Sequence, residues 1–239
     1  MAQILVYTAG IGGAAPYAVD YLVRSGIPVV DYPTPDITHL LLDCPSRTIP
    51  DGLLERLPEG ITVVGGNLNK PELKGYRKLD LLKHEGYLVK NAAITADCAL
   101  RVAAARTAQV FFHMPVLVIG WGRIGKCLCS LLKRIGCCVT VASGTQENRA
   151  ILEALDYRTA DPKGIQDLGQ YAVVFNTAPA PVLNKAIASN CPDTIKIDLA
   201  SVQGLPGEDV IWARGLPGLY APDSSGKLIA DIFMKEVCT

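Results

Sequence analysis

An α/β fold with parallel sheets is the class that the sequence predicts for this chain of 239 residues. Three observations predict it. Short apolar runs alternate with longer segments of helical composition, as in proteins whose parallel strands are joined by helices. Glycine-rich turns follow two of these runs, at Thr8–Gly13 and Gly120–Gly125, and a helix-forming segment follows each turn. The composition, 49% hydrophobic and 19% charged, is that of a globular protein with a sizeable core.

The N-terminal part of the chain, residues 1–92, is predicted to form one domain with helices on both faces of a parallel sheet. Five short runs of β-branched and aromatic residues are bounded by Gly, Pro and Asp, which is typical of strands. The expected strands are Gln3–Tyr7, Ile27–Val30, Thr38–Leu42, Ile61–Val64 and Tyr87–Val89. The expected helices are Ala14–Ser25, Gly52–Leu57 and Leu73–His84.

A long helix within residues 93–113 is expected to link this domain to a second one. The segment Thr95–Phe112 is rich in alanine and arginine, which favour helix. Thr95 is suited to cap the N-terminus of this helix. Asp97 would then place an anion in the first turn, where it interacts favourably with the helix dipole.

Residues 114–239 are predicted to form the second domain, again from alternating strands and helices. Gly136 is expected to end the first of these helices. The expected strands are Val116–Ile119, Val139–Ala142, Ala172–Asn176, Thr194–Asp198 and Val210–Ala213. The expected helices are Arg123–Ile135, Gln146–Leu155, Pro181–Ser189 and Gly226–Glu236.

The sequence VLVIGWGRIG at Val116–Gly125 predicts a Rossmann domain that binds a nicotinamide dinucleotide, because its glycines lie between a strand and a helix. Gly120 permits a tight turn, Gly122 lets the backbone approach a pyrophosphate, and Gly125 allows the helix to pack closely on the strand. The helix N-terminus offers N–H groups to the phosphates. A glycine turn without a ligand is the alternative. The predicted cofactor-binding residues of this loop are Gly120, Trp121, Gly122, Arg123, Ile124 and Gly125.

The end of the next strand favours NADP over NAD as the cofactor. An NAD-binding domain normally has Asp or Glu there, which accepts a hydrogen bond from the ribose 2′-hydroxyl. This strand instead continues into Ser143, Gly144 and Thr145, and the first acid lies inside the following helix. Ser143 and Thr145 can donate hydrogen bonds to a 2′-phosphate, with Arg149 or Arg123 supplying positive charge. A loop without cofactor preference is the alternative.

Two further strand ends are predicted to face the same ligand, because open α/β sheets bind ligands at the carboxyl ends of their strands. Asn176–Pro179 (NTAP) follows one strand and Asp198–Ser201 (DLAS) follows the next. A cap or turn is the alternative role for Asp198, and local backbone bonding is the alternative for Asn176. The predicted cofactor-binding residues here are Asn176, Thr177, Ala178, Pro179, Leu199 and Ala200.

Composition argues against several other classes. The chain has 23 basic and 23 acidic residues, so it lacks the excess positive charge of a nucleic-acid binder. No apolar run approaches the roughly 20 residues that cross a bilayer, and the N-terminus has no signal-peptide pattern, which predicts a cytoplasmic protein without a membrane partner. The eight cysteines form no Cys-x-x-Cys pair and histidines are scarce, so we expect no metal site.

The combination of motifs resembles the family of dipicolinate synthase A subunits. The resemblance covers about residues 90–236 and is carried by Asn91–Ala103 (NAAITADCALRVA), Val116–Leu132, the NTAP and DLAS strand ends, and Gly215–Pro222 (GLPGLYAP) with the SGKLIA that follows. It implies a flavodoxin-like N-terminal domain with a parallel sheet, a doubly wound C-terminal Rossmann domain, and an active cleft between them. It also implies NADP as cofactor, oxidation of a dihydrodipicolinate-type compound to pyridine-2,6-dicarboxylate during spore formation, and, as partner, a separate flavoprotein-like B subunit.

The chain departs from the family pattern where a dicarboxylate substrate would meet cations. Val202 and Gln203 follow DLAS, where the family has Arg and Pro, and Asp223 replaces the lysine of an Ala-Pro-Lys run. In the linking segment, Ile94–Cys98 replaces a Pro-Thr-x-Glu-Gly run. The expected catalytic residues are Thr95, Asp97, Asp198 and Ser201, with Asp97 or Asp198 as the general base.

Three functions stay open from the sequence. The first is hydride transfer from a small heterocyclic dicarboxylate. A 2-hydroxyacid dehydrogenase would need a histidine in the nucleotide-binding half, and none follows His113. A non-catalytic nucleotide-binding paralogue, with the role of a sensor or of a partner to another protein, would explain the lost cations. A homodimer is the expected assembly.

Overall fold

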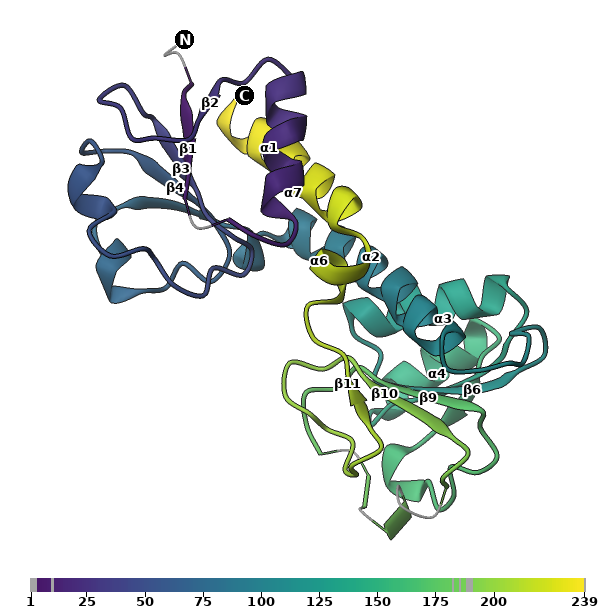
Figure 1. Cartoon of the computed structure of the whole chain (residues 1–239). Helices are drawn as coiled ribbons and strands as arrows, with labels where there is room; N and C mark the ends of the chain where they lie inside the picture. Colours follow the sequence, from purple (N-terminus) through teal and green to yellow (C-terminus); the bar gives the residue numbers. More distant parts are fainter. Residues whose placement is uncertain (1–3, 10, 182, 185, 188–190, 239) are drawn as a thin grey trace. The chain divides into compact units, whose positions relative to one another are not determined.

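Two parallel sheets organise the chain in its computed structural model, which describes residues 4–9, 11–181, 183–184, 186–187 and 191–238 (Figure 1). The sheets belong to two units. The terminal unit contains Met1–Ile94 and Pro217–Thr239, and the central unit contains Thr95–Leu216. Both ends of the chain therefore belong to one unit, whereas the sequence analysis assigned residues 114–239 to a single domain.

The terminal unit has a five-stranded parallel sheet in the order β2-β1-β3-β4-β5. This is the strand order of flavodoxin-like sheets, so the predicted flavodoxin-like N-terminal domain is confirmed. Its strands are β1 (Val6–Thr8), β2 (Val29–Val30), β3 (His39–Leu41), β4 (Thr62–Gly65) and β5 (Arg77–Asp80). Its helices are α1 (Ala15–Arg24), α7 (Pro222–Val237) and the short 3₁₀ helices η1 (Leu54–Arg56), η2 (Pro71–Leu73) and η3 (Leu81–Lys83).

The C-terminal helix α7 belongs to the terminal unit because its apolar face packs on α1 (Figure 1). Leu228 and Phe233 of α7 share a buried cluster with Leu22 of α1. Gly226 brings the two helices close together: a Cβ atom at this position would lie 2.4 Å from the Cβ atom of Tyr17. Because the contact joins the two ends of the chain, local sequence patterns could not place α7 in this unit.

The edge strand β5 occupies a segment that the sequence analysis expected to be helical, and the strand predicted at Tyr87–Val89 is wrong. Those residues belong to α2 (Glu85–Ala104). The ring of His84 accepts a hydrogen bond from the Tyr87 amide at 3.1 Å, which stabilises the first turn of this helix. The strand was missed because its sequence, Arg77–Asp80, carries the charges that suit a sheet edge rather than an apolar run.

Helix α2 begins and ends earlier than the predicted linking helix of residues 93–113. Thr95 lies inside α2 and not at its N-cap. After Ala104 the chain turns, and the Thr107 hydroxyl accepts a hydrogen bond from the Gln109 amide at 3.0 Å. The boundary between the two units, after Ile94, falls within α2.

The central unit has a six-stranded parallel sheet in the order β11-β10-β9-β6-β7-β8. Numbered from its first strand, this is the 3-2-1-4-5-6 order of Rossmann domains, so the predicted doubly wound domain is confirmed. Its strands are β6 (Pro115–Ile119), β7 (Cys138–Ala142), β8 (Arg158–Ala160), β9 (Val173–Asn176), β10 (Ile195–Asp198) and β11 (Ile211–Trp212).

Helices α3 (Arg123–Arg134) and α4 (Gln146–Ala154) follow β6 and β7 as predicted, with η4 (Pro162–Gly164) after β8. A further short helix, α6 (Leu216–Tyr220), precedes α7. The helix predicted over residues 181–189 includes 182, 185 and 188–190, which lie outside the described residues. The edge strand β8 was not predicted, because it has three residues and begins with an exposed arginine.

The strands of the central sheet bury their apolar side chains, and Leu117, Val174 and Leu168 are fully buried in one cluster. None of the helices in the described part of the chain is long and apolar enough to cross a membrane.

Replacement of Gly226 by alanine is expected to destabilise the terminal unit. The new Cβ atom would overlap Tyr17, and overpacking of this kind costs about 1–3 kcal/mol, against a gain of about 1 kcal/mol in helix propensity. Urea denaturation of the full chain measures the change. The exposed Ser224→Ala, in the same helix, is the control and should stay within about 0.5 kcal/mol of the wild type. A Gly226→Ala variant as stable as the wild type would contradict the close contact.

Candidate functional site

The loop between β6 and α3 is shaped by two glycines that no other residue could replace without movement. Gly120 has a φ of +103°, which favours glycine, and a Cβ atom there would lie 2.5 Å from the Thr177 hydroxyl oxygen. A Cβ atom at Gly125 would lie 2.3 Å from the Gly120 carbonyl oxygen. These two positions therefore fix the turn and the approach of α3 to β6.

Gly122 differs from both because the fold itself does not require a glycine there. It is the N-cap residue of α3 with a φ of −80°, and a Cβ atom would have no neighbour within 4 Å. The space beside it adjoins the first turn of α3, whose N–H groups have no partner within the helix. Open space at a helix N-terminus is what an anionic ligand needs.

Trp121 gives this loop an intrinsic spectroscopic probe. Its ring meets the Tyr157 ring edge-on with centroids 5.9 Å apart, and the Lys126 ammonium lies 5.8 Å from its centroid. The neighbouring residues Arg123 and Ile124 form the first turn of α3. A ligand in the space beside Gly122 would change the surroundings of the indole.

A buried network joins the ends of β9 and β10. The Asp198 carboxylate, fully buried, accepts hydrogen bonds from the amides of Ala200 (2.9 Å), Gly204 and Leu205 (both 2.8 Å). It also accepts one from the Asn176 side-chain amide at 3.0 Å. Asn176 in turn donates to the Ala178 carbonyl and accepts from its amide, both at 3.0 Å. These contacts hold the two loops in place, which is the turn-stabilising alternative that the sequence left open.

The loop after β10 is held from the next strand as well. The Trp212 ring nitrogen donates to the Ala200 carbonyl at 3.1 Å, and the Arg214 guanidinium donates to the Ser201 carbonyl. The same guanidinium lies 5.5 Å from the Trp212 ring centroid. Leu199 and Ala200 are buried while Ser201 is exposed. Arg214 places a cation at this edge that the sequence analysis missed, because it is 13 residues away from Ser201 along the chain.

The end of β7 brings a cation and an acid together. Arg149 donates to the Ser143 carbonyl at 2.6 Å and lies 3.4 Å from a carboxylate oxygen of Asp161, at the end of β8. The Ser143 side chain is buried, Gly144 has open space around it, and the Thr145 hydroxyl caps α4 by accepting from the Asn148 amide at 3.3 Å. Asp161 was missed because β8 was not predicted.

The expected site residues fall into two groups. Those of the four loops that follow β6, β7, β9 and β10, including Thr177 and Pro179, lie at the carboxyl edge of the central sheet (Figure 1). Thr95 and Asp97 lie instead on α2, where Thr95 is 8% exposed and Asp97 pairs with Arg101 at 2.8 Å. The glycine loop and the strand ends thus form a coherent site in the central unit.

The cysteines near this site are poor nucleophiles. Burial raises the pKa of the Cys129 thiol of α3 to about 12, and burial together with Cys138 raises the pKa of Cys137 to about 11. Thiolate is the reactive form, so both stay protonated near neutral pH. Within the described residues no group of three His, Cys, Asp or Glu side chains gathers as a metal site would require.

The sequence match to a known protein supports the resemblance that the motifs indicated. No family model matches the chain. The chain is 25% identical over 199 residues to the A subunit of dipicolinate synthase from Bacillus subtilis (strain 168). The match covers 76% of this chain and 66% of that protein, slightly less than two thirds of the relative's length.

The chain resembles the A subunit of dipicolinate synthase. The solved structure of this subunit from Bacillus halodurans has a TM-score of 0.85 at 20% identity, covering 99% of this chain and 98% of that one. A transhydrogenase from Sinorhizobium meliloti has a TM-score of 0.73 at 14% identity, covering 98% and 93%. These structural likenesses show a shared fold, and the one to the dipicolinate synthase protein extends to the terminal unit, beyond the reach of the sequence motifs.

Replacement of Asp198 by alanine is expected to lower the free energy of unfolding by about 3 kcal/mol or more, because buried amide donors would lose their acceptor. Chemical denaturation of the full chain measures the loss. Asp193→Ala, at an exposed position, should change stability by less than about 0.5 kcal/mol. If Asp198→Ala unfolded at the wild-type denaturant concentration, the network would not hold the two loops.

Proposed function

We propose that the chain is an oxidoreductase that binds a nicotinamide dinucleotide at Gly120–Gly125. The observation that carries the proposal is the open space at Gly122, at the N-terminus of α3. The strand before it, β6, lies between β7 and β9, at the point where the strand order reverses and open α/β sheets bind ligands. The resemblance to the dipicolinate synthase A subunit, together with the fold shared with the transhydrogenase, supports this cofactor class.

Each loop of the central sheet edge takes one part of the dinucleotide in this proposal. The pyrophosphate would lie on the glycine loop, where Gly122 leaves room and the first turn of α3 offers N–H groups. The adenosine ribose would lie on Ser143–Thr145. The nicotinamide half would lie on Asn176–Pro179 and on Leu199 with Ala200, whose backbone the buried network holds in place.

The proposed substrate is a dihydrodipicolinate-type compound, whose oxidation to pyridine-2,6-dicarboxylate removes one hydride and one proton. The bound nicotinamide supplies the hydride acceptor. Arg214 would hold a substrate carboxylate beside Ser201, and it would compensate for the cation that is missing at Val202. Thr95 and Asp97 of α2 stay in the proposal as substrate-contacting residues, with Asp97 as the proton acceptor.

Asp198 has a positioning role in this proposal. Both of its carboxylate oxygens already accept hydrogen bonds, three of them from backbone amides of its own loop. A base in such a position could take a proton only by breaking that network, so Asp198 is assigned to holding the nicotinamide-side loop.

NADP is proposed over NAD because of what surrounds the end of β7. The loop Ser143–Thr145 carries no acid, and the Arg149 guanidinium lies against its backbone. The carboxylate of Asp161, which follows β8, is paired with Arg149. A cation at this position attracts a 2′-phosphate, whereas a carboxylate would repel it.

A non-catalytic nucleotide-binding protein is the second candidate, favoured by the engagement of Asp198 in its loop. Turnover distinguishes the two functions: the absorbance of NADPH at 340 nm is followed with dihydrodipicolinate, with and without a dipicolinate synthase B subunit, which is the proposed partner. NADPH formation supports the enzyme, and saturable binding without turnover in either arm supports the second candidate.

The variant Gly122→Val is expected to weaken dinucleotide binding at least about tenfold while leaving the fold unchanged. Its side chain would fill the space proposed for the pyrophosphate, and its backbone conformation is open to any residue. Tryptophan fluorescence, through Trp121, follows the titration with NADP. Ala93→Val, at an exposed position of the terminal unit, is the control. Equal affinity of Gly122→Val and wild type would refute the proposed site.

The variant Arg149→Gln is expected to weaken NADP binding about tenfold and to change NAD binding less than about twofold, because the 2′-phosphate would lose its cation. The same fluorescence titration measures both cofactors. Arg158→Gln, at the opposite end of β8 from Asp161, removes the same charge as Arg149→Gln and serves as the control. An equal loss for NADP and NAD would instead assign Arg149 to holding the loop.

A further inference from the structure

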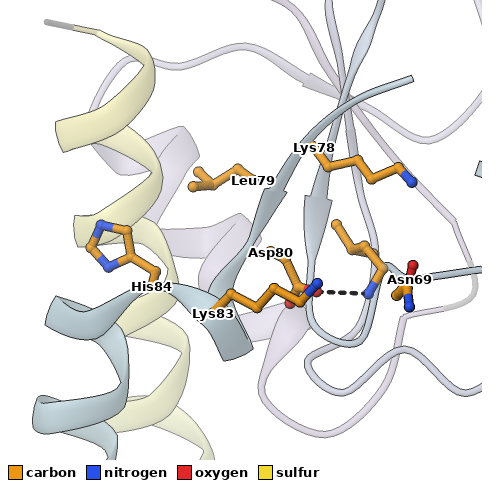
Figure 2. Close-up of a pocket in the computed structure, with 7 residues that line it drawn as sticks. Asn69, Lys78, Leu79, Asp80, Lys83 and His84 are labelled. Carbon is orange, nitrogen blue, oxygen red and sulfur yellow. Dashed lines mark hydrogen bonds between the residues drawn. The ribbon is translucent and has the colours of Figure 1, made fainter. Parts of the chain in front are cut away.

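A second candidate site lies in the terminal unit and shares no residue with the site described above. A pocket of about 400 Å³ opens beside the carboxyl end of β5, between the loop after β4 and the turn η3 (Figure 2). Its volume is in the range of small-molecule sites. The side chains that the argument uses are Asn69, Lys78, Leu79 and Lys83.

The pocket carries a net positive charge because its lining holds two lysines, Lys78 and Lys83, and one acid, Asp80. One carboxylate oxygen of Asp80 accepts from the amides of Asn67 and Leu82, both at 3.1 Å, and the other accepts from the Leu68 amide at 3.0 Å. Lys78 and Lys83 are both exposed, and no ion pair of either is found among the described residues. The Asp80 carboxylate keeps its charge and is held by backbone donors, and the two lysines outnumber it in the lining.

The arrangement of polar groups suits carboxylates better than phosphate. Phosphate sites on α/β folds are built from backbone N–H groups at a loop or helix N-terminus. Here the amide N–H groups of Asn67, Leu68 and Leu82 donate their hydrogen bonds to Asp80. A bound anion would therefore be recognised by side chains. In Figure 2 the side chains of Lys78 and Lys83 extend toward the side on which Asn69 lies.

Leu79 and His84 also line the pocket, and both are held by contacts within the terminal unit. Leu79 is half-buried beside the pocket. His84 is fixed by two contacts, since its ring accepts from the Tyr87 amide at 3.1 Å and lies 3.2 Å from the Glu236 carboxylate. His84 is therefore part of the frame of the pocket, and the two lysines supply the positive charge for a ligand.

We propose that this pocket binds a small organic dicarboxylate. The ammonium groups of Lys78 and Lys83 each receive one carboxylate, and the Asn69 side chain adds a hydrogen bond. The site belongs wholly to the terminal unit, and none of its lining residues is assigned to the dinucleotide site.

Isothermal titration calorimetry of the full chain, without added dinucleotide, tests the proposal with pyridine-2,6-dicarboxylate as the probe. Saturable binding at one site per chain is expected for the wild type. The double variant Lys78→Met, Lys83→Met should weaken it at least about tenfold, and each single variant should weaken it less. The matched control Lys74→Met, Lys90→Met removes two exposed lysines outside the pocket and should bind within about twofold of the wild type.

The charge-conserving variant Lys78→Arg, Lys83→Arg should restore binding, and thermal unfolding of every variant checks that the chain is folded. Absence of saturable binding to the wild type, or unchanged binding after removal of both lysines, would overturn the proposal. Inorganic phosphate binding as tightly as the dicarboxylate would overturn its carboxylate selectivity. Because no dinucleotide is added, each result stands whether or not the dinucleotide titration succeeds.

Discussion

The close packing of α7 on α1 is the constraint on which the architecture of the chain depends. Gly226 lets a helix from the C-terminal end meet a helix from the N-terminal end, and the buried cluster that includes Leu22 and Phe233 is complete only when both are present. The central unit is therefore an insertion between two parts of the terminal unit. The terminal unit cannot complete its core until the last residues of the chain are in place.

Within the central unit, some residues at the sheet edge maintain the structure of the loops, and others leave space that a ligand can occupy. There is no room for a Cβ atom at Gly120 or Gly125, because the neighbouring loop packs against both. Asn176 and Asp198 use their hydrogen bonds to hold the loops after β9 and β10. Gly122 has no such structural role, since a Cβ atom at this position would meet no neighbouring atom. This contrast supports a dinucleotide site more strongly than the spacing of the glycines does, because spacing alone also fits a structural turn.

The two candidate sites are proposed to recognise anions in different ways. At the central sheet the proposed donors are backbone N–H groups at the start of α3, which suit a pyrophosphate. In the terminal unit the loop amides are occupied by Asp80, and recognition is left to the ammonium groups of Lys78 and Lys83. The chemistry of each site thus follows from what its own loop has already bonded.

The sequence by itself determined the features that depend on neighbours along the chain. The apolar runs predicted the buried strands, and the glycine spacing predicted the β6–α3 turn. The motifs indicated the resemblance to the A subunit of dipicolinate synthase, which the sequence match supports. The edge strands β5 and β8 escaped prediction because a strand exposed at a sheet edge carries charges in place of an apolar run.

Tertiary structure alone decided the features that join distant residues. These are the return of α7 to the terminal unit, the pairing of Arg149 with Asp161, the contact of Arg214 with Ser201, and the hydrogen bonds that the Asp198 carboxylate accepts from its own loop. The physical reason is the same in each case. Hydrogen bonding and close packing act between atoms that folding brings together, and their partners cannot be identified from local sequence.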